Sequence, residues 1–302
     1  MRPVQNLRLS EQLHANLQLL LDRLNTPDYF AGVSYFEQDG NLTTLDYNKW
    51  NFRSGVDLNL SSNWKASMQI SGYYSDKTKT FNKIGGEKEE NDYNELLFHV
   101  PYIPNYVNGM PIELLNNNDG NQRYHYGEIK KLNNLAETTE GRTTINLSTE
   151  YKFPFIKGLS ARASYARNMG NSRGSQFGTG YTLYQFAGIG TNGHIYSDDI
   201  TTAPVRSKFY TNGDRLYFDN GHDLSEQYNI TGVYDRTIGN HSISGLFSVE
   251  KSEATAEHEV VWKSGVLAGS NGQFNTANGI VDGSTNKSES GNLAYVGRLN
   301  YA

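Results

Sequence analysis

The stretch from Trp50 to Tyr74 alternates between apolar and polar residues with a period of two. Successive side chains of a β-strand point to opposite faces of the sheet, so this pattern predicts two long strands with one apolar face. Ser61, Ser62 and Asn63 interrupt the pattern, which predicts a tight turn between the two strands. The apolar set comprises Trp50, Phe52, Val56, Leu58, Leu60, Trp64, Ala66, Met68, Ile70 and Tyr74.

The same alternation recurs along the chain and predicts eight strands. Their segments are 28–40, 50–60, 64–74, 143–153, 158–168, 226–239, 241–252 and 292–302. Tight links at 61–63, 154–158 and 238–240 alternate with long polar stretches at roughly 77–142, 170–223 and 255–290. Short turns at one end and long loops at the other are typical of outer-membrane barrels.

The length of the segment from Trp64 to Tyr74 supports a membrane-spanning strand. Its ten steps cover about 33 Å at about 3.3 Å each, and a tilt of about 45° leaves roughly 23 Å of height. The apolar band of such barrels is about 25 Å tall and is bordered by aromatic residues. The sequence therefore predicts an all-β fold, a partial antiparallel up-and-down transmembrane β-barrel with short periplasmic turns and long extracellular loops.

The composition fits a sheet with one apolar and one solvated face. Hydrophobic residues make up 36% of the 302 residues, yet aromatics make up 12%, with 21 Tyr. The net charge of -5 gives no basic surface for nucleic acid, and the absence of cysteine excludes disulfides and thiolate metal sites. No run approaches the roughly 20 apolar residues of a membrane helix, and no signal peptide is evident.

Several segments resemble the SusC/RagA family of TonB-linked outer-membrane transporters. They are "DYFAGVSYFEQDG" (28–40), "YNKWNFRSGVDLNLSSNWKASMQISG" (47–72), "NDYNELLFHVPYIPNYVNGMP" (91–111), "FPFIKGLSARASY" (153–165) and "LAYVGRLNYA" (293–302). The resemblance implies a barrel filled by an N-terminal plug in the outer membrane of a Gram-negative bacterium. It also implies energy supplied by TonB through that plug, and a SusD-like surface lipoprotein that delivers glycans or peptides.

A transporter of this kind has about 22 strands, so we expect residues 28–302 to be an internal piece of the barrel, without plug or TonB box. Residues 1–27 do not fit the family. "SEQLHANLQLLLDRLN" (10–25) has leucines at helical spacing and predicts an amphipathic helix, with Ser10 as N-cap and Pro27 beyond its end. An altered reading frame upstream of Asp28, a false start at Met1 and a genuine helical insertion all remain open.

Two sets of candidate functional residues follow. The polar face would line a wet lumen with Arg53, Asp57, Lys65, Glu150, Lys152 and Arg162. Loop aromatics could stack on a substrate, or could simply pack the loops on one another: Tyr102, Tyr106, Tyr124, Tyr126 and Tyr184. No motif indicates an enzyme, a metal site or a cofactor.

Two other functions remain open from the sequence. One is a complete eight-stranded outer-membrane barrel, which would need no further strands to close. A soluble β-rich glycan-binding module would need a second sheet over the apolar face of 50–74. The importer fragment, which contacts outer-membrane lipid and an oligosaccharide or peptide, is the leading prediction.

Overall fold

The computed structural model describes residues 28–42, 44–81, 93–94, 96–97, 104–116, 120–122, 125–132, 134–186, 204–267, 270 and 272–302. The helix predicted within residues 1–27 lies outside the described residues. In the described part of the chain, no helix is both long and apolar enough to cross a membrane. The elements of the main sheet are β1 (Asp28–Asp39), β2 (Asp46–Ser61), β3 (Trp64–Thr80), β8 (Leu135–Lys152), β9 (Leu159–Phe186), β10 (Pro204–Ile238), β11 (His241–Ser264) and β12 (Val281–Tyr301). The smaller elements are β4 (Tyr106–Val107), β5 (Met110–Pro111), β6 (Leu114–Asn116), β7 (Gly120–Gln122), α2 (Tyr126–Leu132) and η2 (Phe274–Thr276).

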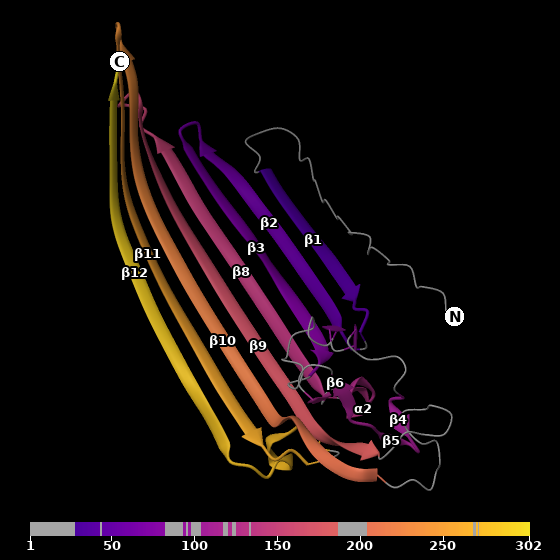
Figure 1. The fold of residues 1–302 in the computed structure, drawn as a ribbon. Helices are drawn as coiled ribbons and strands as arrows, with labels where there is room; N and C mark the ends of the chain where they lie inside the picture. The colour runs from indigo at the N-terminus through magenta and orange to yellow at the C-terminus, as the bar shows by residue number, and fades with distance from the viewer. Residues whose placement is uncertain are drawn as a thin grey trace, which may run out of the picture.

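Eight strands form one antiparallel sheet in the order β1-β2-β3-β8-β9-β10-β11-β12, so each strand pairs with its neighbours along the chain. The strands are twisted and bowed together (Figure 1). β1 pairs only with β2, and β12 pairs only with β11, so the sheet is open at both edges. This confirms the predicted all-β, up-and-down partial barrel. The closed eight-stranded alternative is not the structure of the described strands.

The three predicted tight turns lie at one end of the sheet, which we call the turn end. Residues 62–63 join β2 to β3, 153–158 join β8 to β9, and 239–240 join β10 to β11. Gly158 shows why the middle turn needs its glycine. Its φ is +91°, and an added Cβ would lie 2.2 Å from the carbonyl oxygen of Asp235 on β10. The Asp235 amide donates to the Gly158 carbonyl at 2.8 Å, which anchors the turn against β10.

The opposite end of the sheet, which we call the loop end, corrects the predicted loop lengths. The strands continue far into the stretches taken as loops, so the long connections are 81–134, 187–203 and 265–280. Strand β9 has 28 residues and β10 has 35, well beyond the apolar alternation that revealed them. The error arose because the alternation of an apolar and a polar face stops there: both faces are polar in stretches such as 75–80, while apolar residues such as Leu183 and Phe186 pack into the core at the loop end.

The register carries the apolar face across the sheet. One row of directly opposed residues runs through Leu58, Ala66, Thr149, Ala163, Ile230, Val249 and Tyr295, from β2 to β12. Ile230 is 64% exposed and Trp50 is 51% exposed, so these large apolar side chains have no protein cover in the described residues. The second sheet required by the soluble alternative is not found over this face among the described residues.

The buried core lies at the loop end. Val107, Ile112 and Phe186 form one cluster, and a parallel bridge from Ile112 to Tyr184 attaches the connection 81–134 to β9. Asn134, 1% exposed, fixes the base of that connection. Its Nδ2 donates to the Thr179 carbonyl at 3.1 Å, and its Oδ1 accepts from the Thr179 amide at 3.0 Å. Long-range polar contacts therefore hold the loop segments against the extended strands.

Candidate functional site

The six lumen-facing candidates share the face of the sheet opposite the apolar one, which we call the polar face. The register sets Lys65 opposite Glu150 and Glu150 opposite Arg162, so three charges of alternating sign cross β3, β8 and β9 in one row. Directly opposed side chains of opposite charge attract one another. Lys152 lies two residues beyond Glu150 on the same face, and Asp57 lies opposite Ser67 near this row. The register thus puts these residues on one face of the sheet, and their position in a lumen and their role in transport remain predictions.

Arg53 lies nearer the middle of β2. Its guanidinium lies 5.1 Å from the ring centroid of Phe30 on the neighbouring strand β1.

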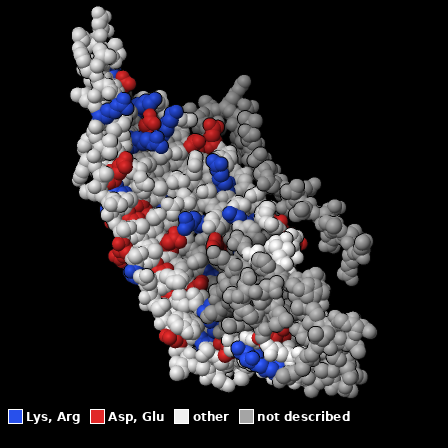
Figure 2. Space-filling model, viewed as in Figure 1, with Lys and Arg blue, Asp and Glu red and all other residues white. Residues whose placement is uncertain are grey.

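Figure 2 looks onto a face where Lys, Arg, Asp and Glu are scattered along the length of the strands, with Lys and Arg gathered near the turn end. Both signs of charge are interspersed, so this surface can hold water and polar solutes without a single dominant field.

Hydroxyl and amide groups connect the strands across the polar face. Ser67 and Ser148 lie 2.6 Å apart between their Oγ atoms, linking β3 to β8. Farther along, Thr144 donates to Asn168 at 2.7 Å, and Asn168 donates to Ser225 at 3.2 Å, linking β8, β9 and β10. Small polar side chains thus bond to each other and still present acceptors and donors to solvent. Such a surface suits a water-filled passage.

An ion pair spans three strands farther toward the loop end. Arg142 on β8 reaches over β9 to Asp223 on β10, with Nη2 3.1 Å from Oδ2. The strand between them contributes Gly170, where an added Cβ would lie 2.0 Å from Asp223 Oδ1. Absence of a side chain on β9 therefore makes room for the contact between the two outer strands. Both side chains are about half exposed, so the pair adds little to the stability of the fold. Its main effect is to hold the two side chains against each other across β9.

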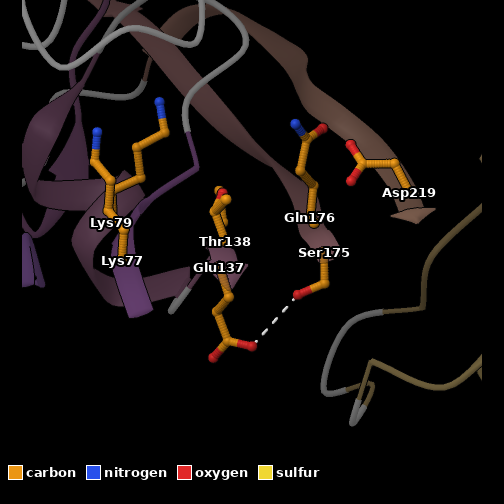
Figure 3. A pocket seen from close by; sticks show the side chains of 9 residues that line it. Lys77, Lys79, Glu137, Thr138, Ser175, Gln176 and Asp219 are labelled. Atoms are coloured by element: carbon orange, nitrogen blue, oxygen red, sulfur yellow. Dashed lines mark hydrogen bonds between the residues drawn. The ribbon is translucent and has the colours of Figure 1, made fainter. Parts of the chain in front are cut away.

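A cavity of about 260 Å³ lies at the loop end, between side chains of β3, β8, β9 and β10 (Figure 3). One row of opposed residues runs Lys77, Thr138, Gly174 and Asp219, and the adjacent row runs Lys79, Ala136, Gln176 and Tyr217. Figure 3 shows the side chains of Lys77, Lys79, Thr138, Gln176 and Asp219 on one side of the strands, with Glu137 and Ser175 on the other. The short side chains in the middle of the rows create the hollow.

The sequence does not reveal this cavity, because its residues fall in stretches where the pattern predicts loops. Lys77 and Lys79 are two residues apart on one strand, as are Thr138 and Ala136. The available signal was that Lys77 and Lys79 are an even number of residues from Lys65, which puts all three on the same face of one strand. This signal was weak because the residues next to Lys77 and Lys79 are also polar, so the strand shows no alternation there.

Aromatic residues border the apolar face at both ends. At the turn end, the Trp64 indole donates to Thr149 Oγ1 at 2.7 Å. Toward the loop end, the rings of Tyr35 and Trp50 lie 4.6 Å apart, and Trp50 is opposite Tyr74. Beyond this border the apolar face turns charged, with Arg167 Nε 3.8 Å from Glu226 Oε1. The apolar face is thus a band with polar limits.

The loop aromatics proposed as substrate contacts have mixed positions. Tyr102 and Tyr124 lie outside the described residues. Tyr184 packs against the cluster of Val107, Ile112 and Phe186, and Tyr126 packs against the neighbouring cluster around Ile129. Both are half-buried, which fits the packing alternative as well as it fits a contact surface.

Tyr106, in the connection 81–134, contacts His125 and Lys131. Its ring meets the edge of His125, with centroids 5.0 Å apart, and the ammonium of Lys131 lies 4.3 Å from its centroid. His125 is 2% exposed and caps α2, since its Nδ1 accepts from the Glu128 amide at 3.2 Å. Its Nε2 lies 2.9 Å from the Asn105 carbonyl oxygen, so the neutral ring bonds through both nitrogens. Burial lowers the pKa of His125 below the usual 6.5.

No cluster of three or more His, Cys, Asp or Glu able to hold a metal occurs in the residues that the structure describes. The fold and the polar face define the protein's class: a partial β-barrel wall with an apolar band on one face and a polar lining on the other. No family model matches the sequence, and a search of curated proteins found no match.

Solved structures give a more particular likeness. The chain is similar to the RagAB peptide transporter, with 15% identity and a TM-score of 0.56. It is similar to the RagAB peptide importer in the open-open state, with 16% identity and a TM-score of 0.61, and in the closed-closed state, with 14% and 0.56. Each alignment covers 91% of this chain and 28% of the other chain. The likeness shows a shared fold over roughly a quarter of those chains.

Proposed function

We propose that this chain forms part of the barrel wall of a TonB-linked outer-membrane importer. Its apolar band faces lipid, and its polar face lines the passage for a nutrient such as a glycan or a short peptide. In the whole protein, TonB acts through a plug, and a surface lipoprotein presents the substrate. The fold likeness to a peptide importer and the resemblance to the SusC/RagA family support this assignment.

One observation carries the proposal most directly. A row of opposed residues crosses seven of the eight strands in register, all of them apolar except Thr149, and its large side chains are uncovered, as with Ile230 at 64% exposure. Monomeric soluble proteins rarely expose contiguous apolar patches larger than a few hundred Å². Hydrocarbon is the medium in which such a band is stable, and the charged row of Lys65, Glu150 and Arg162 on the other face requires water.

The turn end would then face the periplasm and the loop end the exterior, since short turns and long loops have these positions in outer-membrane barrels. The polar face acts by solvation: its hydroxyl, amide and charged groups replace part of the water around a passing solute. No group of this face needs to react with the substrate. The prediction that the protein is not an enzyme follows from this mode of action.

Depth profiling of the apolar band tests the proposal. The chain has no cysteine, so single cysteines can carry nitroxide labels without background. With the chain reconstituted in phosphatidylcholine vesicles, labels at Ile145 and Leu147 should collide mainly with oxygen dissolved in lipid. Labels at Asn146 and Ser148 should collide mainly with a water-soluble nickel complex. Equal access to the nickel complex at all four positions would overturn the proposal.

A further inference from the structure

The cavity at the loop end has an uneven distribution of charge that the general transport proposal does not use. Two ammonium groups, of Lys77 and Lys79, stand on β3, and the carboxylate of Asp219 stands on the far side on β10. Between them lie Thr138, Ala136 and Gly174, whose side chains are short or absent. The hollow is therefore lined by cations on one wall and by an anion on the other.

We propose that this cavity binds the carboxylate group of a ligand through Lys77 and Lys79, while Asp219 accepts a hydrogen bond from an ammonium or hydroxyl group of the same ligand. This inference rests on the proposed function, because it places the contact on the face that lines the passage. Both lysines already make contacts of their own. Because lysine supplies three donors on a flexible stem, each can keep such a contact and still donate to a carboxylate that enters at different angles.

Gly174 controls the position of the anionic wall. An added Cβ there would lie 2.4 Å from Asp219 Oδ1, so the carboxylate leans over β9 toward the middle of the cavity. Neighbouring strands are about 4.8 Å apart, so roughly 10 Å separates β9 from β3. A ligand with donor and carboxylate several bonds apart spans this distance, and a single small ion does not.

The size of the cavity limits the ligand group. Its volume of about 260 Å³ corresponds to roughly nine waters at about 30 Å³ each. One acidic sugar ring or one to two amino-acid residues fills such a space. Gln176 adds an amide at the rim, and its Oε1 already accepts from Arg215 Nη2 at 2.5 Å, which holds it in place. A uronic acid and a peptide C-terminus share the carboxylate, so either is a source of this chemistry.

Binding of small probes to the chain in detergent micelles tests the inference by titration calorimetry. The probes are trialanine, trialanine amide and digalacturonate. We expect binding of trialanine, digalacturonate or both, and at least tenfold weaker binding of the amide, which lacks the carboxylate. The variants Lys77→Gln and Lys79→Gln should each weaken binding about tenfold, and Lys77→Arg should retain most of it. Lys251→Gln, on the opposite face of the sheet, is the matched control and should bind like the wild type.

The outcomes separate the two carboxylate sources and the two proposals. Binding of only trialanine assigns the site to peptides, and binding of only digalacturonate assigns it to acidic sugars. Equal affinity for trialanine and its amide, no binding of any probe, or unchanged binding in both lysine variants would overturn the inference. Circular dichroism of each variant confirms that the strands are retained. If the nitroxide profile alternates while binding fails, only this inference is lost, whereas a flat profile removes the proposed function itself.

Discussion

The strongest test of the lipid-facing band is one added charge on either face of the same strand. Ala163 and Ala166 are both half-buried residues of β9, three positions apart, and the register puts them on opposite faces. Ala163 lies opposite Ile230 in the apolar band, and Ala166 lies opposite Gln227 on the polar face. The substitutions Ala163→Arg and Ala166→Arg therefore change the same residue type by the same charge and volume.

The expected magnitude follows from depth. Ala163 is four residues from Leu159 and four from Arg167, the first charge on this face of β9. Four residues span about 13 Å along the strand and roughly 9 Å of height at a tilt of about 45°, which places Ala163 near the middle of the band. Arginine at the bilayer midplane of a barrel costs about 2–4 kcal/mol. That cost lowers the folding equilibrium constant by about 30-fold to about 700-fold.

Urea unfolding from phosphatidylcholine vesicles, followed by the fluorescence of the 3 tryptophans, measures the effect. Ala166→Arg should stay within about 0.5 kcal/mol of the wild type, because its guanidinium extends from the polar face into water. Equal losses in the two variants would show that both faces tolerate charge alike. A harmless Ala163→Arg would show that the band does not lie in hydrocarbon. Either result would refute the argument from register.

Two further predictions concern the turn end and the loop end. Gly158→Ala should destabilise the sheet by about 2–3 kcal/mol in urea unfolding, because its φ is +91° and the new Cβ meets a carbonyl oxygen at 2.2 Å. Gly232→Ala is the control, since no heavy atom lies within 4 Å of its added Cβ, and equal effects would contradict the steric reasoning. For His125, the lowered pKa means that the undocked segment binds the proton more tightly, so the docking of α2 is fully stable above pH 6.5 and weakens as the pH falls below it. Amide exchange at Glu128 and Ile129, whose N–H groups donate to the His125 carbonyl at 3.0 Å, should accelerate from pH 7.5 to 5.5 relative to the intrinsic rate, and a His125→Phe variant should lose that pH dependence.

The sequence predicted the part of each strand in which one face must be apolar, and little beyond it. Alternation identified all eight strands of the sheet and its three tight turns. Successive side chains of a strand point to opposite faces, so a strand with one apolar face has an apolar residue at every second position. Alternation placed Lys65, Glu150 and Arg162 on one face for the same reason. The cavity around Lys77 and Asp219 escaped because both faces of β3 are polar from Ser75 to Thr80, so no alternation marks that part of the strand. The contact of Asn134 with Thr179 joins segments 45 residues apart, and no local pattern encodes such a pair.

The extension of the strands past the band bears on where selection takes place. On β9, Gly174 lies seven residues beyond Arg167, which is about 23 Å along the strand and roughly 16 Å of height at a tilt of about 45°. In the proposed orientation the cavity therefore lies outside the bilayer. The strands that line it are continuous with the membrane-spanning part and remain paired by backbone hydrogen bonds. Under the proposed function, a ligand that enters from the exterior would meet Lys77, Lys79 and Asp219 before it reaches the row of Lys65, Glu150 and Arg162 at the turn end. A charge-selective contact on a rigid wall ahead of a mixed-charge passage can discriminate among solutes while leaving the passage itself permissive.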